Sequence, residues 1–453
     1  MDFVLLAWIA VPVLFWTVWL IVTGARPLRH IGTLHFALYF LSIYAGSFAF
    51  YDRLGRQNSR FMFSVMAYPF LALCGVVAAG LLDGGRFAVF HGVVPRRSSS
   101  RSERRVVALV TLGLFAALGA FLLILGNRIP LLAVIREGDA AGQIARYVAT
   151  KGYNEAIGRV GPLVWMSRIL IDYFGLYLLT YQYCRIKVGE SSQSRFFGLL
   201  TLLVLATVLF NERYPVVKLL FYFAVVAMFG IERPRISTRA AVRATVMFVL
   251  LIPAIGVVHT VVTHGPRALV EPSTNTVSAL YSEGWTLFLD RVVGGQVGGL
   301  YYIYEIVPRH FDFFHGRTYG NPRGLLPYEQ VNLPSLVYDW YQRSPEGVQG
   351  SDPSAFFGEV YANFGLLVSC LSMFAMGAIL QGANDGLRRL IDRHGTPYYI
   401  ALFFLTATYL ADFALGSTTV YFDARFYLIV LMCVAPRLTV RRLADRSRRL
   451  LST

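Results

Sequence analysis

Long apolar runs, separated by short polar segments, dominate the pattern of hydrophobic and polar positions along this chain. Most runs are close to the ~20 apolar residues that an α-helix needs to cross a membrane. We predict spans at residues 3–23, 31–51, 61–82, 106–126, 161–183, 196–210, 219–231, 244–263, 363–381, 397–415 and 418–435. The fold class is therefore all-α, an integral membrane helical bundle of about eleven (ten to twelve) transmembrane helices in one domain, residues 1–453.

Composition supports a membrane protein, since 56% of the residues are hydrophobic and the mean hydropathy is +0.53. The first run follows Met1 and Asp2 without a basic segment, so we expect no cleaved signal peptide. The four cysteines form no CxxC pair, and the eight histidines form no HxxxH or HExxH pattern. We therefore expect no disulfide framework, no resident metal and no cofactor.

The net charge is +16, and the lysines and arginines are concentrated in alternate segments between the predicted spans. If the C-terminal tail lies inside, the cytoplasmic segments hold more than half of the 42 lysines and arginines; they are 24–30, 83–105, 184–195, 232–243, 382–396 and 436–453. This alternation is the positive-inside pattern, and it argues against a nucleic-acid partner. Two large segments remain outside, 127–160 and the loop 264–362.

Arginines in those two outer segments oppose the positive-inside bias, so they need another explanation. Guanidinium groups hold phosphate through paired hydrogen bonds, which makes an anionic ligand the preferred interpretation. Salt bridges to nearby acids such as Glu137, Glu283, Asp290 and Glu305 are the alternative. The arginines concerned are Arg128, Arg136, Arg146, Arg159, Arg267, Arg291, Arg309, Arg317, Arg323 and Arg343.

The loop 264–362 is also rich in aromatic residues and glycine. Its tyrosines and tryptophan suit stacking on sugar rings, and they equally suit a membrane interface. Its densest stretch is FHGRTYGNPRG, residues 314–324, where glycines permit a backbone that wraps a ligand. We predict a ligand loop with Arg317 and Arg323 on phosphate and His315 as a base, because histidine exchanges protons near neutral pH.

Three segments of this region carry a family resemblance. They are YGNPRGLLP, SDPSAFFGEVYANFG and the apolar LLVSCLSMFAMGAIL. Together they resemble the Wzy-type O-antigen polymerases, the oligosaccharide repeat-unit polymerases of bacteria. The closest piece comprises Gly358, Glu359, Tyr361, Asn363, Phe364 and Gly365. The hairpin NERYPVVK, with Arg213, is a weaker similarity.

The resemblance implies a membrane glycosyltransferase of the GT-C kind in the bacterial inner membrane, with its active site facing the periplasm. It would transfer a growing glycan from undecaprenyl pyrophosphate to a second lipid-linked repeat unit. Membrane lipid and a chain-length-regulating co-polymerase are the implied partners. Two other functions stay open, an O-antigen ligase and a transporter or flippase of lipid-linked sugars.

Glycosyl transfer needs cations for the departing pyrophosphate and a base for the attacking hydroxyl. We expect His315, Arg317 and Glu359 to be catalytic, with His310 and Asp352 as further base candidates. The pair Glu137 and Asp139 is the nearest approach to a metal-binding motif. Arg168 and Asp172 are spaced to pair on one helix face, either structurally or toward a cavity. The expected substrate-binding residues are Arg323, Arg291, Arg136, Arg146, Arg213, Tyr319, Tyr361 and Asp352.

Overall fold

The computed structural model describes residues 3–24, 30–48, 50, 59–83, 95, 98–126, 129, 132, 161–209, 282, 285–286, 297–320, 327–342, 354–416 and 425–436. Within these ranges the regular secondary structure is helical, and no strand is present. Among the described residues, four helices are long and apolar enough to cross a membrane: α1 (Phe3–Val22), α4 (Ser59–Leu82), α5 (Arg101–Leu125) and α15 (Phe356–His394). A helical membrane protein is thus confirmed, whereas the number of eleven spans stays a prediction.

Other predicted spans also coincide with helices. The second corresponds to α2 (Ile31–Leu38), the π-helix η2 (Tyr39–Tyr44) and α3 (Ala45–Ser47), which follow one another directly. Further helices are α8 (Gly161–Lys187), α9 (Gln193–Leu209), α16 (Pro397–Asp412) and an apolar helix over Arg425–Pro436. In its described part, the segment 264–362 contains the short helices α13 (Gly298–Ile306) and α14 (Leu333–Gln342) and the beginning of α15. The predicted spans 219–231 and 244–263 lie outside the described residues.

The chain divides into two compact units. The first comprises Met1–His91, Phe288–Arg389 and Thr406–Asp423. The second comprises Gly92–Leu287, Leu390–Leu405 and Ala424–Thr453. The segment FHGRTYGNPRG and the first turns of α15 both belong to the first unit.

In the first unit, glycine allows α4 and α15 to touch backbone to backbone. A Cβ atom on Gly377 would lie 1.8 Å from the carbonyl oxygen of Ala72, and one on Gly75 would lie 1.9 Å from that of Phe374. Small residues at helix crossings permit such close approach between membrane helices. Around this crossing the core is aromatic: Tyr68 of α4 stacks on Phe357 of α15, with ring centroids 5.2 Å apart.

A chain of polar side chains joins the start of α2 to α15. The N–H of Gly32 donates to Nδ1 of His30 (2.9 Å), which caps the helix. Since Nδ1 accepts, the proton of the neutral ring lies on Nε2, which donates to Oε1 of Gln381 (2.8 Å). Gln381 in turn donates to Asp385 (2.8 Å). Burial lowers the pKa of His30 to about 4, so the ring is neutral at physiological pH.

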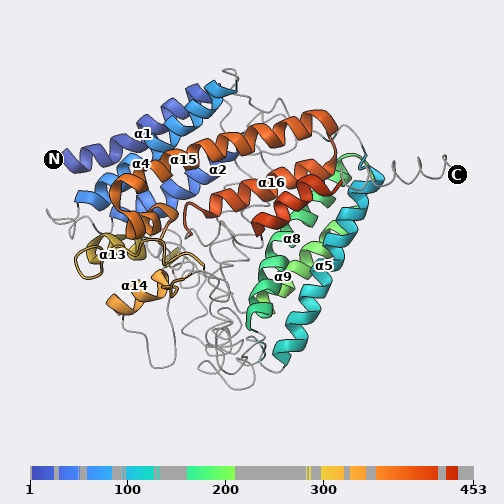
Figure 1. Ribbon diagram of the computed structural model, residues 1–453. Helices are drawn as coiled ribbons and strands as arrows, with labels where there is room; N and C mark the ends of the chain where they lie inside the picture. Colours follow the sequence, from blue (N-terminus) through green and yellow to red (C-terminus); the bar gives the residue numbers. More distant parts are fainter. Residues whose placement is uncertain are drawn as a thin grey trace. The chain divides into compact units, whose positions relative to one another are not determined.

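In the second unit, α5, α8 and α9 lie side by side (Figure 1). Gly175 of α8 lets Leu203 of α9 approach closely, because a Cβ there would lie 2.5 Å from a methyl group of Leu203. Helix α5 begins with a capping box in which Ser100 and Glu103 satisfy each other's backbone N–H groups. Such a cap fixes where the basic segment before α5 ends and the helix begins.

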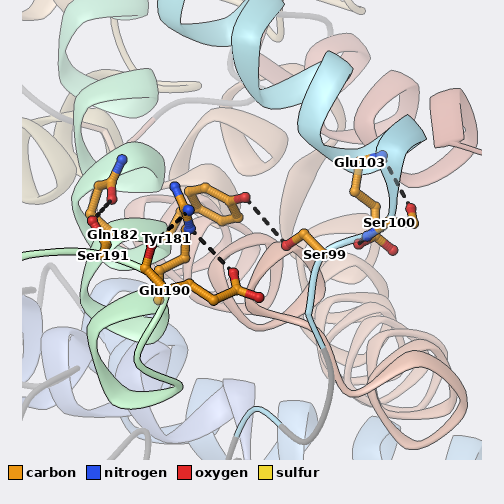
Figure 2. A network of polar contacts seen from close by, with 8 residues as sticks. Ser99, Ser100, Glu103, Tyr181, Gln182, Glu190 and Ser191 are labelled. Carbon is orange, nitrogen blue, oxygen red and sulfur yellow. Dashed lines mark hydrogen bonds and ion pairs between the residues drawn. The ribbon is translucent and has the colours of Figure 1, made fainter.

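Polar contacts also fix the end of α8 and the turn that leads to α9. Figure 2 shows the Tyr181 hydroxyl, which donates to the Ser99 hydroxyl (3.3 Å), and Ser191, which donates to Gln182 (2.9 Å). Arg185 forms an ion pair with Glu190 (3.3 Å). These contacts stabilise the tight turn between two apolar helices.

Candidate functional site

Residues 314–320, the described part of FHGRTYGNPRG, form a short loop that lies against the first turns of α15. Helix α15 is interrupted at this point. Gly365 has a φ of 81°, which no residue in a regular helix adopts, and it kinks α15. The carbonyl groups of Ala362 and Asn363 there accept from the loop instead. The N–H of Phe314 donates to Ala362 (3.0 Å), and the N–H of His315 donates to Asn363 (3.1 Å). The kink therefore provides the backbone acceptors that hold the loop.

Three buried polar side chains complete the attachment of the loop. The hydroxyl of Thr318 donates to Oε1 of Glu359 (2.7 Å) and accepts from Nδ2 of Asn363 (2.6 Å). Oδ1 of Asn363 accepts from the N–H of Gly316 (2.7 Å), and its Nδ2 also donates to the carbonyl of Glu359 (2.8 Å). Glu359, Asn363 and Thr318 are at most 2% exposed. We call these three residues the anchor.

The anchored loop presents a histidine and an arginine to the outside. His315 and Arg317 are both exposed, and they flank Gly316. His315 has a φ of 50°, in the left-handed region that residues other than glycine adopt uncommonly, with asparagine, aspartate and histidine the most frequent among them. A strained backbone of this kind persists only where surrounding contacts enforce it, and it is concentrated at functional sites. Among the described residues, Arg317 forms an ion pair neither with Asp312 nor with Glu329.

Tyr361 has a different position from the one expected of a ligand-binding residue. Its ring is buried and stacks on Tyr304, with centroids 4.1 Å apart. Its hydroxyl donates to the carbonyl of Val307 (3.1 Å) and accepts from Nη1 of Arg60 (3.4 Å). Tyr361 therefore positions the start of the loop and holds an exposed arginine of α4 beside it. Arg60 was not among the predicted site residues.

Tyr319 lies at the other end of the loop and is half-buried. Its ring lies 6.2 Å from that of Phe364, and its carbonyl accepts from the hydroxyl of Tyr328 (3.2 Å). The N–H of Val331 donates to the carbonyl of Arg317 (2.8 Å). These contacts hold the segment that contains Tyr328 and Val331 against the loop.

The structure thus brings together five of the predicted site residues, which are His315, Arg317, Tyr319, Glu359 and Tyr361. His310 is described too, and its ring lies against Trp340. Helix α15 begins at Phe356, seven residues before the predicted span 363–381. The remaining predicted residues lie outside the described ones; they are Arg136, Arg146, Arg213, Arg291, Arg323 and Asp352.

Two members of the site had weak sequence signals. Arg60 precedes the predicted span 61–82, in a segment that the predicted parity places outside, so the positive-inside argument applied to it as well. Thr318 had no signal, because a threonine in a polar loop is unremarkable until its partners are known.

The chemistry available to this site is acid–base and electrostatic. The imidazole of His315 can accept a proton, and the guanidinium groups of Arg317 and Arg60 can neutralise an anion. Among the described residues, no group of three or more His, Cys, Asp or Glu side chains could hold a metal ion. The pair Glu137 and Asp139 lies outside those residues. No family model, curated protein or solved structure matches the chain.

Proposed function

We propose that this protein polymerises undecaprenyl-pyrophosphate-linked oligosaccharide repeat units into a surface polysaccharide. It would act as a membrane glycosyltransferase in the bacterial inner membrane, with the loop that carries His315 and Arg317 on the periplasmic side. The observation that carries this proposal is the pairing of an exposed histidine and arginine on a loop that a buried anchor holds. A catalytic loop needs a rigid attachment to the fold and reactive side chains that are exposed to the substrate.

The proposed roles follow from the chemistry of glycosyl transfer. The bond between the anomeric carbon of the growing glycan and pyrophosphate breaks, and undecaprenyl pyrophosphate leaves with its electron pair. Arg317 neutralises that leaving group through its planar fork of N–H donors. A new bond forms between the anomeric carbon and a hydroxyl oxygen of the acceptor sugar. His315 accepts the proton of that hydroxyl.

The anchor contributes by positioning rather than by chemistry. Glu359 accepts a hydrogen bond from Thr318, so its carboxylate sets the conformation of the loop that holds His315. We assign Glu359 a positioning role in this mechanism. A displacement of about 1 Å at a reacting group can lower a rate by about a hundredfold, so such positioning matters for the reaction.

Further cationic side chains would bind the pyrophosphate of the lipid carrier. Arg60 lies beside Tyr361 at the start of the loop and is exposed, so we add it to the proposed pyrophosphate ligands. The proposal retains the sequence-derived substrate residues Arg323, Arg291, Arg136, Arg146, Arg213, Tyr319 and Asp352. A chain-length-regulating co-polymerase is the proposed protein partner, as the family resemblance implies.

The experiment that tests this function is the glycan profile of a strain in which the gene is deleted. If the protein is the polymerase, its lipopolysaccharide should carry single repeat units in place of a ladder, and a plasmid copy should restore the ladder. Lipid that carries no glycan at all would indicate a ligase. An unchanged ladder together with an unchanged capsule and exopolysaccharide would contradict the proposal.

A further inference from the structure

An exposed aromatic surface lies next to the anchored loop, on α14 and on the segment that follows α13. Trp340 of α14 is 46% exposed, although tryptophan usually buries most of its ring. The ring of His310 lies 4.8 Å from the Trp340 ring, and Phe311 meets it edge-on at 5.7 Å. We call Trp340, His310 and Phe311 the aromatic platform. Contacts on these rings fix the indole in place, which lowers the entropy lost when a ligand binds to it.

The platform is continuous with the proposed site. Phe311 also contacts Phe314, with ring centroids 6.4 Å apart. Phe314 is buried, its N–H donates to Ala362, and it immediately precedes His315. A molecule that binds Trp340 would therefore lie beside the loop that presents His315 and Arg317.

The surroundings of Trp340 argue for a polar ligand rather than for lipid. Within residues 297–320 and 327–342, no large hydrophobic side chain other than that of Trp340 is exposed. The apolar positions Leu333 and Val337 of α14 are buried, whereas Asp339, next to Trp340, and Asp312, next to Phe311, are exposed. Stable attachment to a membrane interface needs a contiguous apolar face, which this segment does not offer.

We infer that the aromatic platform is a subsite for one sugar ring of the oligosaccharide. The C–H groups on one face of a pyranose are apolar and pack on an indole ring, while the hydroxyl groups at its rim need polar partners. His310, whose ring lies against Trp340, supplies such a partner, and the exposed Asp312 and Asp339 are sequence neighbours of Phe311 and Trp340. This inference rests on the proposed function for the identity of the substrate, and it adds a specific place where the sugar binds.

The test uses the purified full-length protein and the oligosaccharide repeat unit, released from its lipid carrier by mild acid. Titration of this sugar should change the tryptophan fluorescence of the protein. The change should disappear in Trp340→Phe, which keeps an aromatic ring but removes this fluorophore. It should persist in the control Trp285→Phe, which removes another exposed tryptophan.

A second measurement gives the affinity independently of fluorescence. By calorimetry, Trp340→Ala should bind the oligosaccharide at least about tenfold more weakly, because truncation of a central aromatic contact commonly has this effect. Trp340→Phe should retain most of the affinity, which also shows that the position tolerates substitution. Unchanged affinity in Trp340→Ala would overturn the subsite, and so would a wild-type protein that does not bind the sugar. Neither result depends on the glycan ladder of the deletion strain, which tests the proposed function by itself.

Discussion

Removal of a single hydroxyl should release the loop that carries His315 and Arg317. Thr318 is 2% exposed and forms two hydrogen bonds through Oγ1, one to Glu359 and one from Asn363. Thr318→Val keeps the shape of the side chain but removes both bonds. Thr318→Ser keeps the hydroxyl and removes only a methyl group, so it is the matched control.

The energetic effect can be estimated from these two bonds. Removal of one partner of a buried hydrogen bond costs about 1–3 kcal/mol, because the polar group of the other partner stays buried without it. The variant Thr318→Val should therefore lose about 3 kcal/mol of loop attachment, which corresponds to roughly a hundredfold shift toward the released loop. The loss should be local, since the helices of the first unit do not depend on this hydroxyl.

Hydrogen exchange measures this shift directly. The N–H groups of His315 and Gly316 both donate to Asn363, so they exchange only when the loop opens. In Thr318→Val their exchange should accelerate by roughly a hundredfold, while amides within α4 should keep their protection. Thr318→Ser should stay near wild type. Equal protection of His315 and Gly316 in wild type and Thr318→Val would refute the assigned role of the anchor.

Three further predictions concern packing, pH and topology. Gly377→Ala should destabilise the protein by about 3 kcal/mol or more, seen as a lower Tm, because its Cβ would meet backbone; Gly382→Ala, with nothing within 4 Å of its Cβ, should not. Burial lowers the pKa of His30 to about 4, below the unfolded value of about 6.5, so its neutral form is favoured by folding. The contribution of His30 to the free energy of unfolding should be complete above pH 6.5 and should decline by up to about 3 kcal/mol as the pH falls toward 4, so His30→Asn should show a shallower loss of stability with falling pH than wild type in denaturation measurements. Alkaline phosphatase fused after residue 330 should be active and after residue 445 inactive; the reverse pattern would contradict a periplasmic site.

Hydropathy located α1, α4 and α5 closely, because each coincides with an apolar run flanked by polar residues. It was less accurate for α15, where the predicted span 363–381 is only the middle of a helix that covers Phe356–His394. Hydropathy reports the part of a helix that is apolar, and the polar turns at both ends continue the helix without that signal. The kink at Gly365 was not predicted either, since a glycine alone does not identify its backbone angle.

The sequence directed attention to the region of the candidate site, whose function stays a prediction, and it did not reveal the contacts within that region. The density of charge and glycine made the segment around His315 and Arg317 the candidate site. The anchor could not be predicted, because Thr318 and Glu359 are 41 residues apart and meet only in the folded chain. Arg60 and Tyr361 are separated by 301 residues. Roles that arise from such distant contacts require the structure.

The most direct test of the central claim is chain extension by the purified protein in lipid vesicles supplied with the undecaprenyl-pyrophosphate-linked repeat unit. Wild type should produce longer lipid-linked glycans and release one undecaprenyl pyrophosphate for each unit added. Arg317→Lys keeps the charge but loses the planar fork, so it should abolish extension, as should His315→Ala. Arg104→Lys, the same change at an exposed arginine of α5, should extend normally. Normal extension by both loop variants would contradict the assignment of this loop as the active site.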